Sequence, residues 1–451
     1  LRAERGARRA GTRTLLVDEP FRGTLCANAG CMPSKLLIAA AGAAHRSRNA
    51  DVFGVKTGQV TVDGRAVMAR LRHERDKFVA ATRASFDDLP DGTCIKARAR
   101  FTGPAELALD TGDTVRATAV IVATGSETVV PGPFKSLGPL ALTNESVFDL
   151  KELPRSLAVI GGGAIGLELA QAMARLGVDT ELFDRESSVG GAHHPDVRKS
   201  LERELGTELP LHLGVDVTAQ RVDAQVRLSW TGASCGSRNF DRVLVATGRA
   251  PRIEGLCLEA TGLDLEDTGL PRFDPDTLQC GDAPIFIAGD ADACRPVLHE
   301  ASDEGSVAGR NAVAYPAIRP AKRGPAFTVT FTDPPLAVIG DPPGDETVTG
   351  SASYADQGRA KVEATAKGLV RIYADGDGRL TGAELFCPGA DHMAHLLAYA
   401  ILRGDSASDL LDLPFYHPTL EEGLKSALRE ICAQTPTELP TDRDPGNAPG
   451  S

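Results

Sequence analysis

The sequence predicts an α/β protein with several domains, and three observations support that prediction. Short apolar strands lead directly into glycine-rich turns, one such turn opens a helix, and part of this pattern recurs near the N-terminus. With 451 residues the chain is long enough for about three domains of ordinary size. Its hydrophobic content of 42% suits a large buried core.

The net charge and the cysteine content argue against a nucleic-acid-binding, membrane-bound or secreted disulfide-rich protein. The chain has 49 Lys and Arg against 61 Asp and Glu, and its net charge of -12 has the wrong sign for binding nucleic acid or an anionic membrane surface. Its longest apolar stretches are too short to span a bilayer. Nine cysteines, an odd number scattered over a long chain, do not form the pattern of a secreted disulfide framework, so we expect a reducing, cytoplasmic compartment.

The most specific motif lies at 157–184. An apolar strand leads into GGGAIG, a helical stretch follows, and a second strand ends at Asp184. In a dinucleotide site Gly161 permits the tight turn, Gly163 lets the backbone approach a pyrophosphate, and Gly166 lets the helix pack on the strand. Asp184 can bind a ribose hydroxyl and repels a 2'-phosphate, which favours NAD over NADP. The alternative is that the glycines serve packing alone.

The N-terminus repeats the second half of this unit. A shift of 166 positions sets Gly11 on Gly177 and Asp18 on Asp184, so residues 1–18 correspond to the helix and second strand of another dinucleotide unit. On that register the chain begins directly after the last glycine of the turn. We therefore expect the chain as given to keep a ribose carboxylate in Asp18, to lack the first strand and pyrophosphate loop, and to bind its dinucleotide poorly.

Three further strands end where a dinucleotide would lie. TAVIVATGS and DRVLVATGR are near copies in which an apolar strand leads into Ala-Thr-Gly, and IFIAGDADA is a third strand, which ends in Gly-Asp. An acid at the C-terminal end of a strand can bind a sugar-like chain, and its alternative role as a helix N-cap is compatible with that. The candidate cofactor contacts at these strand ends are Ala123, Thr124, Gly125, Gly248, Gly289 and Asp290.

Two cysteines lie five positions apart in GTLCANAGCMPSK, at Cys26 and Cys31. Pro33 suits the first turn of a helix, so Cys31 is expected near a positive helix end that lowers the pKa of its thiol. This spacing indicates a reversible redox disulfide. A structural thiol pair and a metal site are the alternatives, although no further ligands have the spacing of a metal site.

A candidate base lies near the C-terminus, in FYHPTLEEGL. Thiol–disulfide exchange needs a base to form the attacking thiolate, and His is the side chain best matched to neutral pH. His417 precedes a predicted helix whose first turn carries Glu421 and Glu422. Thr419 and Glu422 match a capping box, which is one candidate role for Glu422. His417 as an ordinary loop residue is the alternative.

Together these motifs resemble the flavin-dependent pyridine nucleotide-disulfide oxidoreductases, in that family's order and over nearly the whole chain, and within the family the dihydrolipoyl dehydrogenases most of all. The resemblance implies two Rossmann-like domains that bind FAD and NAD(P) and an α+β C-terminal dimerisation domain. The implied segments are 1–146 for the first part of the FAD domain, 147–274 for the NAD domain, 275–317 for the second FAD part, 318–438 for dimerisation and 439–451 for a disordered tail.

The resemblance also implies roles for individual residues. It places Cys31 against the flavin, in a charge-transfer contact, and assigns exchange with the substrate's sulfur to Cys26. It pairs Lys35 with Glu168 close to the reactive nitrogen of the flavin ring, although each reads as an ordinary helix residue in the sequence alone.

The implied reaction is the oxidation of dihydrolipoamide, carried on a lipoyl arm, with FAD and NAD as cofactors. In the family, His417 and Glu422 would come from the other subunit of a homodimer, so that neither monomer is active alone. Glutathione reductase-like enzymes use NADP, which Asp184 disfavours, and mercuric reductases usually carry an extra C-terminal cysteine pair, where this chain has only Cys432. A dimer without flavin that serves as a non-enzymatic scaffold is the alternative from another class.

Overall fold

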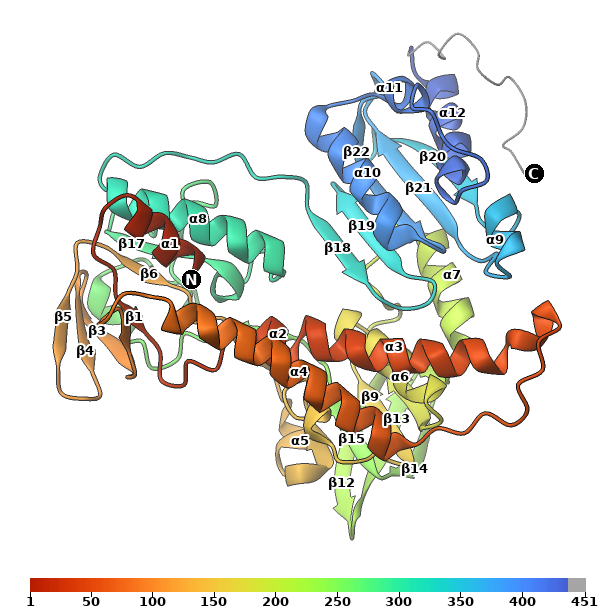
Figure 1. Cartoon of the computed structure of the whole chain (residues 1–451), viewed down its shortest axis with the longest axis horizontal. Helices are drawn as coiled ribbons and strands as arrows, with labels where there is room; N and C mark the ends of the chain where they lie inside the picture. Colours follow the sequence, from red (N-terminus) through yellow and green to blue (C-terminus); the bar gives the residue numbers. More distant parts are fainter. Residues whose placement is uncertain (437–451) are drawn as a thin grey trace. The chain divides into compact units, whose positions relative to one another are not determined.

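A computed structural model describes residues 1–436, and the expected disordered tail at 439–451 lies outside the described residues (Figure 1). The chain forms two compact units, which are described separately. Unit 1 comprises Leu1–Met32, His73–Val129 and Gly248–Arg323, and unit 2 comprises Pro33–Arg72, Val130–Thr247 and the chain from Gly324. No helix among the described residues is both long and apolar enough to cross a bilayer.

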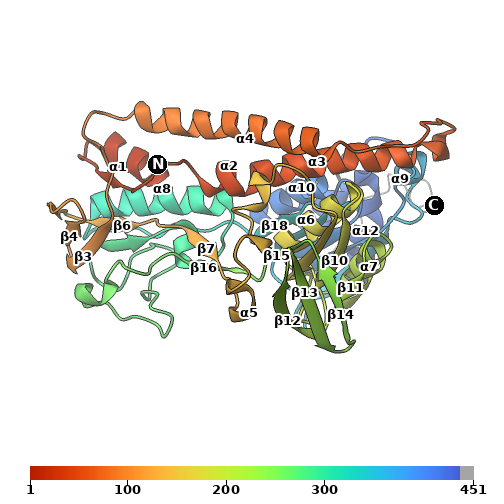
Figure 2. The same ribbon diagram turned by 90° about the horizontal axis from the view of Figure 1, so that it is seen from below.

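Unit 2 contains a parallel sheet with the strand order β11-β10-β9-β15-β8. A β-meander of three antiparallel strands packs on one face of this sheet, and α6 covers the other (Figure 2). The bounds are β8 Ala141–Leu142, β9 Ser156–Ile160, α6 Ala164–Arg175, β10 Asp179–Phe183, α7 Pro195–Gly206, β11 Leu211–His212, β12 Val215–Val222, β13 Gln225–Gly232, β14 Gly236–Phe240 and β15 Arg242–Val245.

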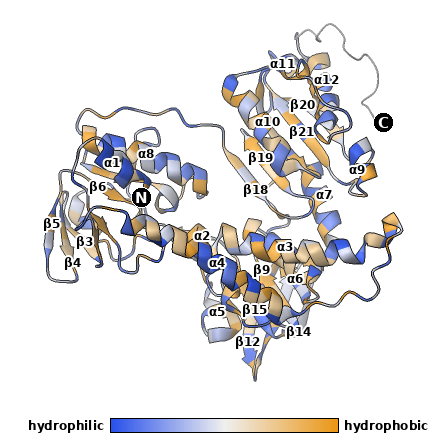
Figure 3. Ribbon diagram, in the orientation of Figure 1, coloured by the Kyte–Doolittle hydropathy of each residue, from blue (hydrophilic) through white to orange (hydrophobic). Residues whose placement is uncertain are grey.

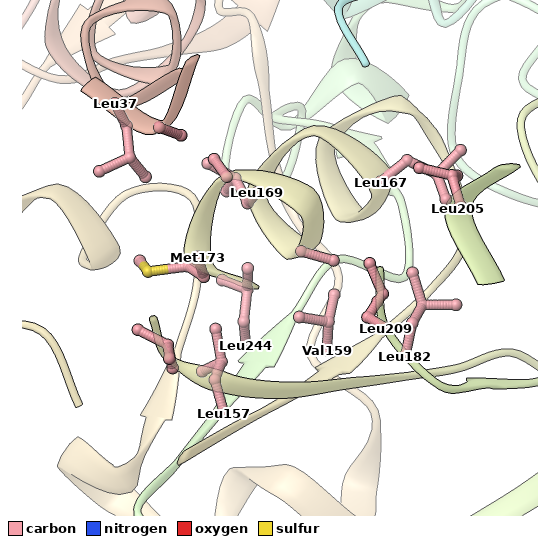
Figure 4. Close-up of a cluster of buried hydrophobic side chains, with 14 of the residues drawn as sticks. Leu37, Leu157, Val159, Leu167, Leu169, Met173, Leu182, Leu205, Leu209 and Leu244 are labelled. Carbon is pink, nitrogen blue, oxygen red and sulfur yellow. The ribbon is translucent and has the colours of Figure 1, made fainter. Parts of the chain in front are cut away.

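The apolar run of β9 follows from burial on both faces, as is usual for a central parallel strand. Leu157 and Val159 point toward α6 and belong to the same buried cluster as Leu169 and Met173 of that helix (Figure 4). The alternate residue Ala158 belongs to a second cluster, formed with side chains of the meander. Because successive side chains of a strand alternate between faces, one short strand contributes to two separate cores and fixes the position of the turn that follows it.

A second sheet of unit 2 is antiparallel, with the order β18-β19-β22-β21-β20. Helices α10 and α12 pack against it, and its strands β19 and β21 are largely orange in Figure 3 because they are rich in aliphatic residues. The bounds are β18 Phe327–Thr330, β19 Leu336–Gly340, β20 Val348–Ser353, α9 Gly358–Val362, β21 Leu369–Ala374, β22 Leu380–Phe386, α10 Ala390–Arg403, α11 Ala407–Leu411 and α12 Leu424–Gln434.

In unit 1 the parallel strands form two separate pairs, β1 with β2 and β6 with β17. Helix α1 packs on α8, where Gly309 leaves no room for a Cβ against the backbone of Ala3. The bounds are α1 Arg2–Arg9, β1 Leu16–Val17, α2 Leu25–Ala29, β2 Cys94–Ile95, β3 Ala99–Gly103, β4 Glu106–Leu109, β5 Thr114–Arg116, β6 Val120–Val122, β7 Ser126–Thr128, β16 Arg249–Pro251, β17 Ile285–Ile287 and α8 Leu298–Ala314. Helices α3, Cys31–Arg48, and α4, Gly64–Asp87, each contribute residues to both units.

Candidate active site

The two cysteines lie where the short helix α2 meets the long helix α3. Cys26 is in α2 and Cys31 is the first residue of α3, with Pro33 in the first turn, as the sequence predicted. Gly30 lets the helices approach, because a Cβ there would lie 3.1 Å from the Cα of Cys26. Both cysteines are thiols. The hydrogen bond to Cys31, together with burial and the charge of Cys31, raises the pKa of Cys26, so Cys26 keeps its proton, and Cys31 is the more exposed of the two.

Lys35 and Glu168 meet, as the resemblance implied. The Lys35 Nζ donates to Glu168 Oε2 at 2.9 Å and to Oε1 at 3.0 Å, and it also lies 4.2 Å from the centre of the Phe331 ring. The backbone N–H of Phe331 donates to Glu168 Oε1 at 3.0 Å. Because Glu168 is buried while Lys35 is partly exposed, the carboxylate fixes the lysine head on the accessible side of the pair.

His417 and Glu422 also form a pair. The His417 Nδ1 donates to Glu422 Oε2 at 3.0 Å, which leaves Nε2 to face outward on a side chain that is 65% exposed, while the carboxylate is buried. The backbone N–H of Thr419 donates to the same oxygen at 3.1 Å. The predicted capping box is therefore only half formed, because the Thr419 hydroxyl donates to Tyr416 O instead of accepting from the helix.

Two side chains that the sequence did not single out hold the backbone between His417 and Glu422. The Tyr354 hydroxyl donates to Leu420 O at 2.9 Å, and the Gln357 amide donates to Thr419 O at 2.7 Å. Both come from a segment more than sixty positions earlier in the chain. Their contacts fix the loop that carries the imidazole.

The glycine turn after β9 has the geometry that the motif predicted. Gly161 has a φ of 109°, and a Cβ there would overlap the carbonyl of Ala246 at the end of β15. A Cβ at Gly166 would overlap the carbonyl of Gly161, so close packing of α6 on the turn requires glycine. Gly163 caps α6, and no atom lies within 4 Å of its Cβ position. The turn thus presents an open backbone surface at a helix N-terminus, which fits the pyrophosphate of NAD.

Asp184 follows β10 directly. Its Oδ2 accepts the N–H of Gly162, and its Oδ1 accepts the N–H of Glu186 at 2.8 Å. Each carboxylate oxygen can accept more than one hydrogen bond, so both can still receive ribose hydroxyls. The carboxylate thus joins the glycine turn to the chain that follows β10, and its remaining acceptor capacity fits ribose hydroxyls.

In unit 1 the candidate acids stand at strand ends as well. Asp18 follows β1, accepts the N–H of Phe21 at 3.2 Å, and has a pKa raised by burial. Asp290 follows β17 and accepts from the Ser126 hydroxyl at 2.7 Å. Both carboxylates fit sugar-like hydroxyls of FAD. The described residues of unit 1 contain no glycine turn like the one after β9 that would receive its pyrophosphate.

The two Ala-Thr-Gly strands end where β7 and β16 pair. Gly125 O accepts from Arg252 N at 2.8 Å, and Gly248 O accepts from Val129 N at 3.0 Å. Both glycines have positive φ angles, and their Cβ positions face open space. Ala123 and Thr124 precede the first of them, directly after β6.

A buried acidic cluster beside Gly289 was missed in the sequence. Glu304 accepts the N–H of Gly289 at 2.7 Å and pairs with Arg323, and burial, followed by the charge of Asp292, raises its pKa to about 7. The Asp292 Oδ2 is buried without a partner among the described residues. Glu300 pairs with Arg323 at 3.0 Å. The cluster has no sequence signal beyond an acid-rich helix, because its members meet only in the fold.

Family models and curated relatives point to the same protein family. A sequence model described as pyridine nucleotide-disulphide oxidoreductase matches residues 1–307, and the dimerisation domain of the same group matches residues 326–428. The dihydrolipoyl dehydrogenase of Haloferax volcanii is 30% identical over 448 residues, which cover 94% of this chain and 92% of that protein. The dihydrolipoyl dehydrogenase of Thermus scotoductus is 30% identical over 455 residues, with coverage of 96% and 95%.

Solved structures share the fold. The HOCl-induced flavoprotein disulfide reductase RclA from Escherichia coli superposes with a TM-score of 0.80 at 22% identity, over 95% of this chain and 97% of that one. LpdA from Mycobacterium tuberculosis gives a TM-score of 0.81 at 22% identity, over 95% and 96%. At this level of identity the likeness concerns the fold alone, which agrees with the α/β class predicted from the sequence.

Proposed function

Since the chain belongs to the pyridine nucleotide-disulphide oxidoreductase family, which uses FAD and NAD, we propose that it oxidises dihydrolipoamide to lipoamide and passes the electrons to NAD. One observation carries the proposal: Cys26 in α2 and Cys31 at the start of α3 are brought together by the close approach of the two helices at Gly30, as a reversible disulfide requires. The names of relatives about 30% identical over almost the whole chain support dihydrolipoamide as the substrate.

The reaction begins with the Cys26–Cys31 disulfide. His417 removes a proton from one substrate thiol, and the resulting thiolate attacks the sulfur of Cys26, which breaks the bond to Cys31 and forms a mixed disulfide. The second substrate thiol then displaces Cys26, so that lipoamide leaves with a new S–S bond and both cysteines are reduced. Glu422 holds the Nδ1 proton of His417, which keeps Nε2 as the accepting nitrogen.

We propose that the strand ends and the glycine turn hold the cofactors. FAD, when bound, would supply the chemistry that accepts two electrons from the reduced cysteines and passes them on to NAD. Asp18 and Asp290 would hold hydroxyls of FAD, with Ala123, Thr124, Gly125, Gly248 and Gly289 as backbone contacts. Gly161, Gly163, Gly166 and Asp184 would hold NAD. Lys35, fixed by Glu168 one helical turn beyond Cys31, would place a positive charge beside the flavin ring.

The quaternary assignment rests on the matched dimerisation domain, which indicates a homodimer. We further propose that His417 and Glu422 act on the cysteines of the partner subunit and that the substrate arrives on a lipoyl-bearing domain. We also propose that the protein works in the cytoplasm, in agreement with its odd number of cysteines, nine, scattered over a long chain. Dissociated subunits are then expected to be inactive.

Turnover assays with three substrates test the proposal. The purified chain, supplied with FAD, is mixed with dihydrolipoamide and NAD, with oxidised glutathione and NADPH, or with mercuric ion and NADPH. Formation of NADH in the first mixture alone supports the proposal. Turnover only in the second or third would assign the chain to the glutathione- or mercuric-reductase type. A colourless protein that is inactive in all three would favour the scaffold role.

A further inference from the structure

Glu384 is a fully buried carboxylate in the antiparallel sheet of unit 2. It lies on β22 with 0% of its surface exposed. Burying a carboxylate is costly unless hydrogen-bond donors replace water. Its two oxygens accept the backbone N–H groups of His193 at 2.7 Å and His194 at 3.0 Å. The residue therefore holds a loop that belongs to the other sheet of the unit.

The held loop, residues 185–194, runs from Asp184 to the start of α7 and touches the glycine turn on its way. The Gly190 N–H donates to Gly162 O at 2.9 Å, and the Val189 side chain fills the space where a Cβ on Gly162 would lie. Gly190 itself has a φ of 85° and leaves no room for a Cβ beside Leu201. The loop thus lies against the middle glycine of the turn and is hydrogen-bonded to it.

A second charged side chain of the same sheet fixes the helix that follows the loop. Arg371 lies on β21, opposite Glu384 in the strand register, and donates to Asp196 Oδ2 at 2.8 Å. Asp196 is in the first turn of α7. The loop is therefore anchored at its end by two neighbouring strands and near its middle by the glycine turn.

We propose that Glu384 is a positioning residue for the dinucleotide. By fixing loop 185–194 it keeps the glycine turn and Asp184 in the arrangement that binds NAD, and so a residue of the antiparallel sheet tunes a site on the parallel sheet. The inference rests on the proposed function only in that NAD is the ligand. It needs no assumption about the dithiol substrate.

The test compares E384Q with E430Q in the full-length protein. Glutamine keeps the volume of Glu384 but supplies only one accepting oxygen for two N–H donors. Glu430 is the control, because it also accepts a backbone N–H in the same domain, from Ser351 at 2.8 Å, and that hydrogen bond does not involve loop 185–194. We expect E384Q to bind NADH at least about fivefold more weakly in calorimetric titration, and E430Q to bind it like the wild type.

If Glu384 only stabilised the fold, E384Q would have a lower melting temperature but an unchanged dissociation constant for NADH. That result would overturn the proposal. A second readout is the rate at which dihydrolipoamide bleaches the bound flavin without NAD. That rate should stay at the wild-type value in E384Q, and an equal loss of this rate and of NADH affinity would also overturn the proposal. Because the affinities are compared with NADH alone, a failure of dihydrolipoamide as the substrate would leave the comparison intact.

Discussion

Both units place an acid at the end of a parallel strand, but the surroundings of that acid differ between them. In unit 2, Asp184 belongs to a continuous five-stranded sheet and accepts the N–H of Gly162 from the neighbouring glycine turn. In unit 1, Asp18 and Asp290 follow strands of two separate two-stranded pieces, and Asp290 is held by a serine hydroxyl. The difference shows that a carboxylate at the end of a parallel strand can be held either by a backbone N–H of a neighbouring turn or by a side-chain hydroxyl.

The interiors of the two units differ as well. The sheet of unit 2 is buried between aliphatic side chains of α6 and aromatic residues of the meander. Beside Gly289, unit 1 buries Glu304 and Asp292 instead. The carboxylate beside Gly289 has a pKa raised to about 7 by burial and by the charge of Asp292, so we expect the stability of unit 1 to depend on pH near neutrality.

The largest effect is expected in unit 1, at the thiols. Replacing either Cys26 or Cys31 by Ser removes the exchangeable disulfide, so dihydrolipoamide oxidation should fall by at least about a thousandfold. NADH affinity, which depends on the turn in unit 2, should not change. Cys94→Ser is the control, because this cysteine is exposed on β2. Substantial turnover by either active-site variant would contradict the redox assignment.

The next effect concerns the base. His417→Gln removes the proton acceptor while Glu422 stays in place, so kcat with dihydrolipoamide should fall by about a hundredfold or more. NADH-dependent reduction of ferricyanide, which needs no thiol deprotonation, should be retained. His395→Gln on α10 is the matched histidine control. Equal loss of both activities would show that the substitution damages the fold and not the proton transfer.

Two alanine variants separate packing from binding in the glycine turn. Gly166→Ala places a Cβ against the Gly161 carbonyl and should reduce the free energy of unfolding by about 2 kcal/mol. Gly163→Ala enters open space at a compatible φ of −73°, so stability should change by less than about 0.5 kcal/mol.

The same Gly163→Ala variant should weaken NADH binding by about tenfold, because its methyl group occupies the approach to the pyrophosphate. Urea unfolding and NADH titration measure the two effects. If Gly163→Ala bound NADH like the wild type, the pyrophosphate would not lie over this residue.

Features determined by neighbouring residues could be predicted from the sequence. The glycine turn, the helix start at Cys31 and the acid after β10 each depend on a short stretch of chain, and the structure places them as expected. The pairing of Lys35 with Glu168 joins residues 133 positions apart and followed only from the resemblance. The role of Glu384 could not be predicted, because its two hydrogen-bond donors lie 190 and 191 positions earlier in the chain. The sequence of its strand has no feature that sets it apart from other strands.

The acidic cluster of unit 1 also joins residues that are apart in the sequence and could not be predicted from it. Its expected effect on the free energy of unfolding is the smallest of those predicted. Burial and the charge of Asp292 raise the pKa of Glu304 from its ordinary value of 4.5 to about 7. The folded protein then binds this proton more tightly than the unfolded chain does, so the proton contributes stability at low pH and that contribution is lost as the pH rises toward 7. We expect a loss on the order of 1 kcal/mol between pH 5 and pH 8, and a smaller loss in Glu304→Gln.

Glu300 provides the control with the opposite sign. Burial raises the pKa of its carboxyl, but Arg295 and Arg323 outweigh burial and lower it overall. Its ion pairs therefore stabilise the folded state above the ordinary pKa, and that contribution is lost as the pH falls. In urea titrations at several pH values, Glu300→Gln should be less stable than the wild type at pH 7 and approach it in acid, while the relative stability of Glu304→Gln should rise with pH. If each variant shifted the free energy of unfolding by the same amount at every pH, the two carboxylates would contribute through packing and not through titration. The predicted pH sensitivity of unit 1 would then be wrong.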